Sequence, residues 1–297
     1  MPDSDFFAIK NCTLAELIDA GDAYLAQHDL VYGHGTDNSF DESAWLALEA
    51  CGISPAEPVR NYNIPVNARQ LQRAKEWFRH RATDNIPVAY LTGRSWFAGL
   101  EFLVDKRALI PRSPIAELIG KRFTPWLSTS PNAALDLCCG GGCIGIAVAI
   151  EFPECSVDAL DLSADALALA TDNVAKHMLQ QRVTLHQGDL FEPIEALHQY
   201  DLIVSNPPYV DAKDMHTLDK EFAHEPQMGL AAGPDGLDIV ARMLKLAKNY
   251  LSEEGVLIVE VGNSQRAVEK RFAKLDLQWL DFEYGGDGVF LVRSSSL

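Results

Sequence analysis

The residues best suited to chemistry follow one another directly after an apolar stretch. They are Asn206, Pro207, Pro208 and Tyr209. Because proline lacks an N–H, Pro207 presents only its carbonyl oxygen, and Asn206 adds a side-chain carbonyl oxygen. Two fixed acceptors can hold both hydrogens of a planar –NH2 group while the ring of Tyr209 stacks on its flat face. The pattern therefore predicts a site for a planar amino or amide group.

The chemistry that such a site can perform is transfer of a group to nitrogen. An amide nitrogen is a poor nucleophile because its lone pair is delocalised into the carbonyl. Two acceptors turn the lone pair toward an electrophile and stabilise the positive charge that develops on the nitrogen. We assign catalytic roles to Asn206, Pro207 and Tyr209. A Pro-Pro pair alone would also fit a rigid turn that closes a strand, but such a turn requires neither the asparagine nor the tyrosine.

A glycine-rich stretch after another apolar run is the second candidate site. It contains Asp136, Cys138, Cys139, Gly140, Gly141 and Gly142. Gly140, Gly142 and Gly145 fit G-x-G-x-x-G, and an acid about 20 residues further on, Asp161, is placed to bind a ribose. This pattern fits both a dinucleotide such as NAD and S-adenosylmethionine. The carboxylate of Asp136 suits the sulfonium and ammonium of S-adenosylmethionine better than a pyrophosphate.

A third candidate group follows the next apolar run. Asp189 can accept a hydrogen bond from an adenine amino group, with Leu190 and Phe191 against the ring. Ordinary capping of a turn or of a strand end is the structural alternative for Asp136, Asp161 and Asp189.

All of these residues lie at the ends of expected strands, and helical segments separate those strands. We expect strands at 133–137, 156–160, 183–186, 200–204, 256–261, 277–283 and 289–292. We expect helices up to 149 and at 164–178, 234–250 and 265–275. This alternation predicts a Rossmann-like, doubly wound, seven-stranded α/β sheet with helices on both faces. Ligands of such sheets bind beyond the carboxyl ends of the strands, where the candidate residues fall.

The segment before the sheet reads as a small helical domain. Thr13 and Glu16 fit a capping box, and further helices are expected at 41–51 and 67–82. The basic stretch 69–81 is expected to be a solvated helix face. Residues 96–104 predict a hairpin with a glycine turn. We therefore divide the chain into a helical substrate-recognition domain (1–93), a hairpin connector (94–112) and a catalytic domain (113–297).

Composition narrows the classes of partner. The net charge of −17 disfavours binding to a phosphate backbone and favours a basic partner. No apolar run is long enough for a membrane helix and the first residues do not form a secretory signal, so we expect a cytoplasmic protein without membrane contact. The six cysteines show neither a disulfide framework nor paired zinc-ligand spacing, so we expect no metal.

The motifs together carry a resemblance to a known family. Residues 206–209 with the loop 136–142 resemble the amino-group N-methyltransferases of the class I S-adenosylmethionine methyltransferase fold, which act on DNA adenine or protein glutamine. Residues 110–112, 225–226 and 233–237 resemble the protein-(glutamine-N5) methyltransferase family. The resemblance implies S-adenosylmethionine as cofactor, held by residues 138–142, Asp161, Asp189 and Leu190. It places substrate contacts on Pro111, Arg112 and residues 206–209, and we assign Asp136 and Asn206 to the cofactor as well.

Two branches of that family act on different proteins. One methylates the Gly-Gly-Gln loop of release factors, and the other a glutamine of the large-subunit ribosomal protein L-three. Residues 33–38, 112–114 and 284–288 resemble the ribosomal branch, which implies methylation of the glutamine N5 of a basic ribosomal protein. The release-factor enzyme is the first alternative. A DNA adenine methyltransferase, an NAD-dependent oxidoreductase and a non-catalytic ribosome-assembly module are the others.

The chain departs from the family pattern at one point. The family usually has Thr-Gly-Ser-Gly where this chain has Cys139, Gly140, Gly141 and Gly142. Hydroxyl contacts to the methionine part of the cofactor are therefore expected to be missing, whereas backbone contacts persist.

Overall fold

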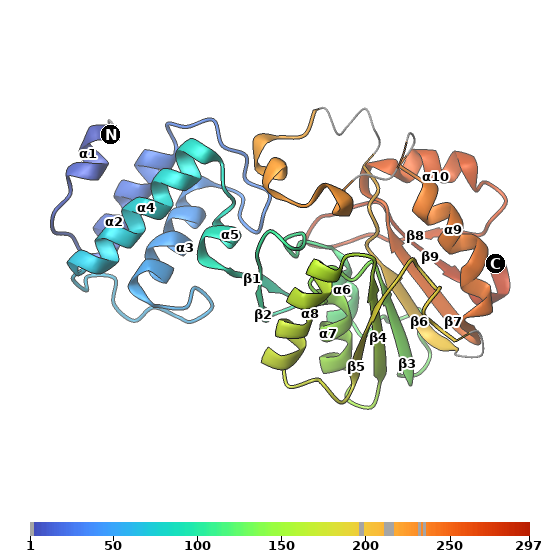
Figure 1. The fold of residues 1–297 in the computed structure, drawn as a ribbon. Helices are drawn as coiled ribbons and strands as arrows, with labels where there is room; N and C mark the ends of the chain where they lie inside the picture. Colours follow the sequence, from blue (N-terminus) through green and yellow to red (C-terminus); the bar gives the residue numbers. More distant parts are fainter. Residues whose placement is uncertain (1–2, 196–198, 211–216, 231–232, 234–235) are drawn as a thin grey trace. The chain divides into compact units, whose positions relative to one another are not determined.

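A computed structural model describes residues 3–195, 199–210, 217–230, 233 and 236–297. The chain divides into two compact units (Figure 1). One unit comprises residues 1–94 with the short segment 219–224, and the other comprises residues 95–218 and 225–297. The first is helical and the second contains the large sheet.

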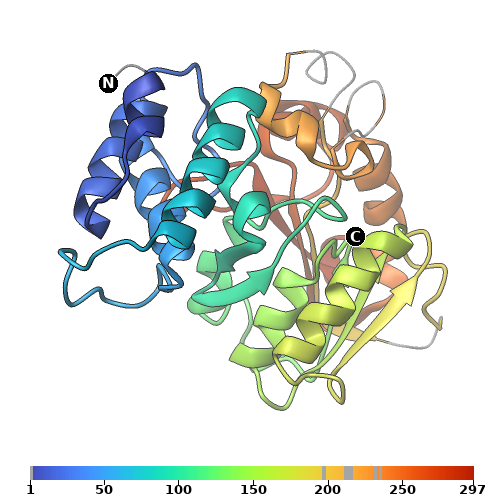
Figure 2. The ribbon, with the colours of Figure 1, turned by 60° about the vertical axis from the view of Figure 1, so that its left-hand side comes forward.

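The N-terminal unit is built from five α-helices in its described part. They are α1 (Asp3–Ala8), α2 (Leu14–Leu25), α3 (Ser39–Cys51), α4 (Ala68–Asp84) and α5 (Val88–Thr92), joined by the 3-10 helix η2 (Lys220–His224). Figure 2 shows α2, α3 and α4 as neighbours. The capping box is confirmed, since Thr13 Oγ1 accepts from Glu16 N at 3.3 Å and Glu16 Oε2 accepts from Thr13 N at 2.8 Å. The helices predicted at 41–51 and 67–82 are α3 and α4.

One expectation for this unit is wrong. Arg81, placed in sequence on a solvated helix face, is only 1% exposed. Its guanidinium lies between two buried carboxylates, 2.5 Å from Glu42 Oε2 and 3.0 Å from Glu221 Oε1, and donates to Val31 O at 2.9 Å. A charge can be buried only when it is paired and hydrogen-bonded, and these partners satisfy that condition. They lie 39 and 140 residues from Arg81, so helical periodicity could not reveal them.

The second unit contains a seven-stranded sheet with the order β5-β4-β3-β6-β7-β9-β8. The strands are β3 (Ala133–Leu137), β4 (Ser156–Asp161), β5 (Val183–Gln187), β6 (Tyr200–Ser205), β7 (Leu251–Glu260), β8 (Gln278–Trp279) and β9 (Val289–Arg293). The first five pair in parallel, and β9 runs antiparallel to β7 and β8. The expected α/β fold is confirmed. The hairpin is also confirmed, as β1 (Arg94–Phe97) and β2 (Leu100–Leu103).

Helices cover both faces of this sheet. Figure 1 shows α6 (Ile115–Gly120), α7 (Cys143–Glu151) and α8 (Ala164–Lys176) on one side, and α9 (Asp238–Leu246) and α10 (Gln265–Arg271) on the other. Alternate residues of β3 therefore meet different helices. Leu135 and Leu137 join the core that contains Val240 of α9, while Asp136 faces α7 and accepts from Gly145 N.

Three predicted elements are clearly shorter than expected, and one of them is the helix predicted at 265–275, which ends at Arg271 as α10. The helix predicted at 234–250 begins as an α-helix at Asp238 and continues after Leu246 as a 3-10 helix; residues 234 and 235 lie outside the described part. The strand predicted at 277–283 contains only Gln278 and Trp279. One more bond to β9 follows, from Leu280 N to Val289 O at 2.9 Å, and Glu283 N and Tyr284 N then donate to the carboxylate of Glu117.

The buried charges of the N-terminal unit give a test of its stability. Replacing Arg81 by methionine leaves two buried carboxylates without their cation, so we expect a loss of about 3–5 kcal/mol in unfolding free energy. Urea unfolding of the full-length protein measures it. Arg79→Met, at an exposed position of the same helix, is the control and should cost less than about 0.5 kcal/mol. Equal effects of the two substitutions would contradict a paired buried charge at Arg81.

Candidate functional site

The topology of the sheet brings the predicted groups to one edge. Leu137 of β3 is the register partner of Leu160 in β4 and of Ser205 in β6, and Asp161 pairs with Gln187 of β5. The carboxyl ends of these four strands are therefore adjacent. They carry the glycine loop, Asp161, the segment with Asp189, and the segment with Asn206. In an open parallel sheet this edge is where ligands bind.

Asp136 is the buried acid of this edge. Its side chain is fully buried, and Oδ2 accepts from Gly145 N of α7 at 2.8 Å. Among the described residues, its other oxygen Oδ1 has no hydrogen-bond partner. Burial raises the pKa of Asp136 to about 7, and the N–H of Gly145 opposes that rise. A buried carboxylate oxygen without a donor is suited to a cationic ligand.

The glycine loop is held from both sides by side-chain contacts. Gly140 N donates to Asp161 Oδ2 at 2.8 Å, and Asn173 Nδ2 donates to Gly141 O at 2.9 Å. Gly142 has φ +81°, and a Cβ there would lie 3.3 Å from Ala170 Cβ. Only glycine fits this close turn without strain. The loop is therefore held through its backbone, although it lacks the hydroxyls of the family pattern.

The cysteines of the loop are thiols and not thiolates. Burial raises the pKa of Cys138, Cys139 and Cys143 above the ordinary thiol value. Thiols that stay protonated are poor metal ligands and poor nucleophiles. The described residues contain no group of three or more His, Cys, Asp or Glu that could hold a metal ion.

Asp161 and Asp189 differ in what they contact. Both oxygens of Asp161 accept backbone N–H groups, from Gly140 and from Ser163, each at 2.8 Å. Asp189 Oδ2 accepts from Arg242 at 2.9 Å and stays partly exposed. The side chain of Leu190 is buried in the core with φ +53° at its backbone. Phe191, placed in sequence beside a ring ligand, stacks on Tyr250 at 4.5 Å between centroids.

One exposed residue at this edge was not expected from the sequence. Leu162 follows Asp161 directly and is 56% exposed, unlike most large apolar side chains of the sheet. An exposed leucine beside the end of β4 offers an apolar surface for a flat ring. A hydrophobic residue directly after the predicted ribose acid was the signal available in the sequence.

The segment after β6 presents the two predicted acceptors. Pro207 is buried, and Asn206 is half-buried. Within the described part of the chain, no hydrogen bond uses the side chain of Asn206 or the carbonyl oxygen of Pro207. Both oxygens therefore remain able to accept hydrogens from a bound –NH2 group.

Tyr209 is fixed by residues that the sequence analysis did not single out. Its hydroxyl donates to Glu260 Oε1 at 3.3 Å, and its carbonyl oxygen accepts from Ser264 Oγ at 3.0 Å. Burial, followed by the charge of Glu260, raises the pKa of the Tyr209 hydroxyl, which therefore stays protonated. An acid at the end of the fifth predicted strand was the signal for Glu260.

The predicted substrate residues 111–112 lie in a connector that a buried carboxylate organises. Glu225 accepts from both terminal nitrogens of Arg112, at 2.6 and 2.7 Å, and from Ile110 N at 3.1 Å. This bidentate pair fixes the backbone on either side of Pro111.

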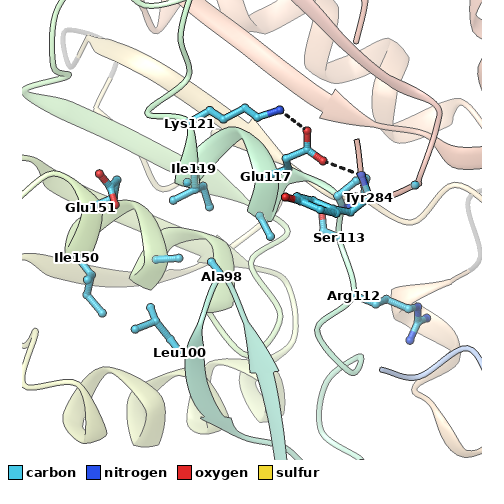
Figure 3. A pocket seen from close by; sticks show the side chains of 15 residues that line it. Ala98, Leu100, Arg112, Ser113, Glu117, Ile119, Lys121, Ile150, Glu151 and Tyr284 are labelled. Carbon is cyan, nitrogen blue, oxygen red and sulfur yellow. Dashed lines mark hydrogen bonds and ion pairs between the residues drawn. The ribbon is translucent and has the colours of Figure 1, made fainter. Parts of the chain in front are cut away.

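A surface cavity of about 630 Å³ lies between the β1–β2 hairpin, α6 and α7. Leu100, Ile119 and Ile150 give it an apolar lining, and Figure 3 shows Glu117 bonded to Lys121 and to the backbone of Tyr284 at its rim. Arg112 is the one predicted site residue in its lining, and in Figure 3 this side chain points away from the cavity. The cavity is therefore separate from the predicted cofactor residues.

Comparison with known proteins places the sheet and the helices in named families. The family profile described as methyltransferase small domain matches residues 123–277, just over half of the chain. The profile described as PrmC N-terminal domain matches residues 16–93. No helix in the described residues is long and apolar enough to cross a membrane.

Two curated relatives are similar over almost their full length. The chain is 41% identical to the ribosomal protein uL3 glutamine methyltransferase of Bordetella pertussis, covering 96% of each chain. It is 39% identical to the protein of the same name from Burkholderia pseudomallei, covering 96% of this chain and 95% of that one.

The solved structures add support for the fold alone. The hMettl16 catalytic domain, in complex with MAT2A 3'UTR hairpin 6, is 12% identical with a TM-score of 0.52. The match covers 80% of this chain and 87% of that one.

The raised pKa of Asp136 predicts how stability depends on pH. A carboxyl group whose folded pKa lies above its unfolded value stabilises the fold when protonated, and this stabilisation is lost as the pH rises through about 7. Asp136→Asn, a neutral isostere, should therefore gain stability over wild type as pH increases from 5 to 8.5, by up to roughly 3 kcal/mol. Urea unfolding without cofactor at several pH values measures this. If the stability difference between Asp136→Asn and wild type narrows or reverses at high pH, this would contradict a buried carboxyl group with a raised pKa.

Proposed function

The chain belongs to the family of ribosomal protein uL3 glutamine methyltransferases, and from that premise we propose its reaction. It transfers a methyl group from S-adenosylmethionine to the side-chain amide N5 of a glutamine in ribosomal protein uL3, the large-subunit protein L-three. The single observation that carries this proposal is the pair of oxygens on Asn206 and Pro207, beside the glycine loop, that accept no hydrogen bond from the described residues. Membership of the family sets aside the oxidoreductase interpretation of that loop.

The residues of the sheet edge fit a cationic cofactor. Asp136 contributes a buried carboxylate oxygen that lacks a donor, which suits the positive charges of S-adenosylmethionine better than a pyrophosphate. We propose that residues 138–142 hold its methionine part through their backbone, and that Asp161 binds the ribose. Asp189, the backbone of Leu190 and the exposed Leu162 are proposed to surround the adenine, and Asn206 is proposed to lie at the junction with the substrate. When bound, the cofactor supplies an electrophilic methyl group.

The chain's own residues prepare the amide. Asn206 Oδ1 and Pro207 O accept the two N–H groups of the glutamine side chain, which fixes the plane of the amide and aligns its lone pair. The same two oxygens stabilise the positive charge on nitrogen as a new bond forms. Tyr209 packs on the flat face of the amide through its ring, while its hydroxyl is held by Glu260. We propose that Pro208, Pro111 and Arg112 shape the substrate side of the site.

The electrostatics of the chain support a ribosomal protein as substrate. A net charge of −17 attracts a basic protein and repels a nucleic acid backbone. We therefore propose a basic protein partner, no direct contact with nucleic acid sequence, and residence in the cytoplasm, where ribosomes are assembled. The N-terminal helical unit, which matches the PrmC N-terminal domain, is proposed to recognise the protein substrate.

The reaction is tested with labelled S-adenosylmethionine and purified proteins. We expect wild-type protein to label uL3 on one glutamine, identified by mass spectrometry of the product. Asn206→Ala should lower kcat by at least about 100-fold because one of two charge-stabilising acceptors is lost. Its affinity for S-adenosylmethionine should change little.

A matched asparagine provides the control for that variant. Asn132 precedes β3 at the opposite edge of the sheet, where its side chain contacts Asp201, and Asn132→Ala should retain wild-type kcat. Labelling of a release factor on its Gly-Gly-Gln loop, with no labelling of uL3, would move the assignment to the release-factor branch. Full activity of Asn206→Ala would overturn the two-acceptor mechanism.

A further inference from the structure

We propose that Glu260 and Ser113 are positioning residues that fix the ring of Tyr209 and, through it, the plane in which the substrate amide is held. The inference rests on the proposed function, because it concerns how the same site orients a glutamine side chain. It adds two residues, from β7 and from the segment before α6, that contact neither the cofactor nor the substrate.

The register of the sheet explains why Glu260 lies beside residues 206–209. β7 is the parallel neighbour of β6, and Val259 is the partner of Ser205. Glu260 and Asn206 each follow one residue later, so they lie at adjacent strand ends. Glu260 is only 6% exposed. A carboxylate in such a place is costly unless each oxygen finds a donor.

Both oxygens of Glu260 do find a donor. Ser113 Oγ donates to Oε2 at 2.5 Å, and the Tyr209 hydroxyl donates to Oε1 at 3.3 Å. Ser113 is itself buried, and its position is fixed by Pro114 and the start of α6. One carboxylate therefore joins the α6 segment to the catalytic tyrosine.

The remaining contacts leave the Tyr209 ring little freedom. Gly262 has φ +44°, and a Cβ at this position would lie 2.8 Å from Cε2 of the ring. A Cβ on Gly236 would lie 2.4 Å from the carbonyl oxygen of Tyr209. These two glycines let the chain pack directly against the ring and its backbone, and Glu260 fixes the hydroxyl end. The tyrosine is thus held at three points.

We expect that loss of the contacts that hold Tyr209 changes kcat more than KM. The affinity for a protein substrate comes from a large surface, whereas the rate depends on the fraction of bound amides whose nitrogen is aligned for attack. A ring that tilts when its hydroxyl is released lowers this fraction but leaves the protein–protein surface intact. Loss of an interaction that acts in this way lowers kcat and kcat/KM together.

A purely structural role for Glu260 predicts something different, and the chain contains a matched pair for comparison. Tyr200, at the opposite end of β6, is buried and donates its hydroxyl to Asp158 Oδ2 at 2.7 Å. Like Tyr209, this tyrosine donates its hydroxyl to a carboxylate of the same sheet, here on β4. Disrupting the Tyr200–Asp158 hydrogen bond therefore shows how much stability is lost when a tyrosine–carboxylate pair of this sheet is broken.

The test is a double-mutant cycle on the full-length protein. We expect Glu260→Ala to lower kcat by about 30-fold and Tyr209→Phe by a similar factor, with KM for the protein substrate changed less than about threefold. The double variant should be no slower than either single variant, because both remove one shared contact. Glu260→Gln keeps an acceptor oxygen for the hydroxyl and should recover most of the rate. Tyr200→Phe and Asp158→Ala should lower the melting temperature and leave kcat unchanged.

Several results would overturn the positioning role. They are multiplicative effects of Glu260→Ala and Tyr209→Phe, no recovery in Glu260→Gln, or a loss of kcat in Asp158→Ala equal to that in Glu260→Ala. If Glu260→Ala does not fold, Ser113→Ala, which removes one of the two donors, should still lower kcat by about threefold to tenfold. An unchanged kcat in that variant would also overturn the role.

Labelling experiments with the wild-type protein test the proposed function separately from this inference. The labelling of uL3 by the wild-type protein tests only which protein is the substrate. The variants are then compared with wild type on whichever protein it labels, uL3 or a release factor. No labelling of either protein would overturn both proposals.

Discussion

A strand that ends in Asn-Pro-Pro cannot extend its ladder of hydrogen bonds, because two consecutive residues have no N–H to donate. At the end of β6, no donor within the described chain bonds to the side-chain oxygen of Asn206 or to the carbonyl oxygen of Pro207. The order of the sheet then determines what lies beside them. β3 on one side brings the glycine loop, and β7 on the other brings Glu260. The proposed cofactor residues and the contacts that hold Tyr209 therefore lie on either side of the end of β6.

The two buried acids that flank this strand serve opposite needs. Asp136 has one oxygen bonded to Gly145 and, among the described residues, one without a donor, which is why we propose it for a cationic ligand. Glu260 has a donor on each oxygen and needs no ligand. Burial raises the pKa of both groups. The difference in donors, and not in burial, is why we propose the first acid for the cofactor and the second for the architecture of the site.

The sequence predicted those features whose signals are local. Strand ends, the glycine loop, the capping box at Thr13 and the Asn-Pro-Pro-Tyr segment all have signals within about ten residues. The features that were missed depend on partners far away in the chain. Arg81 is buried because of Glu221, 140 residues distant, and the backbone N–H groups of Glu283 and Tyr284, beyond β8, donate to the distant Glu117. Asn173, which holds Gly141, has no local pattern that marks it, and the pairing of Glu225 with Arg112, 113 residues away, could not be read from the segment 225–226 alone.

Distant partners of this kind also explain how the chain beyond the catalytic segment is held. Glu221 belongs to the N-terminal unit, where it accepts from Arg81 and from Val31 N. Glu225, four residues later, belongs to the sheet unit, where it accepts from Arg112 and Ile110 N. Each carboxylate is buried and paired within its own unit, so each resists displacement strongly. The short segment between them is therefore fixed at both ends.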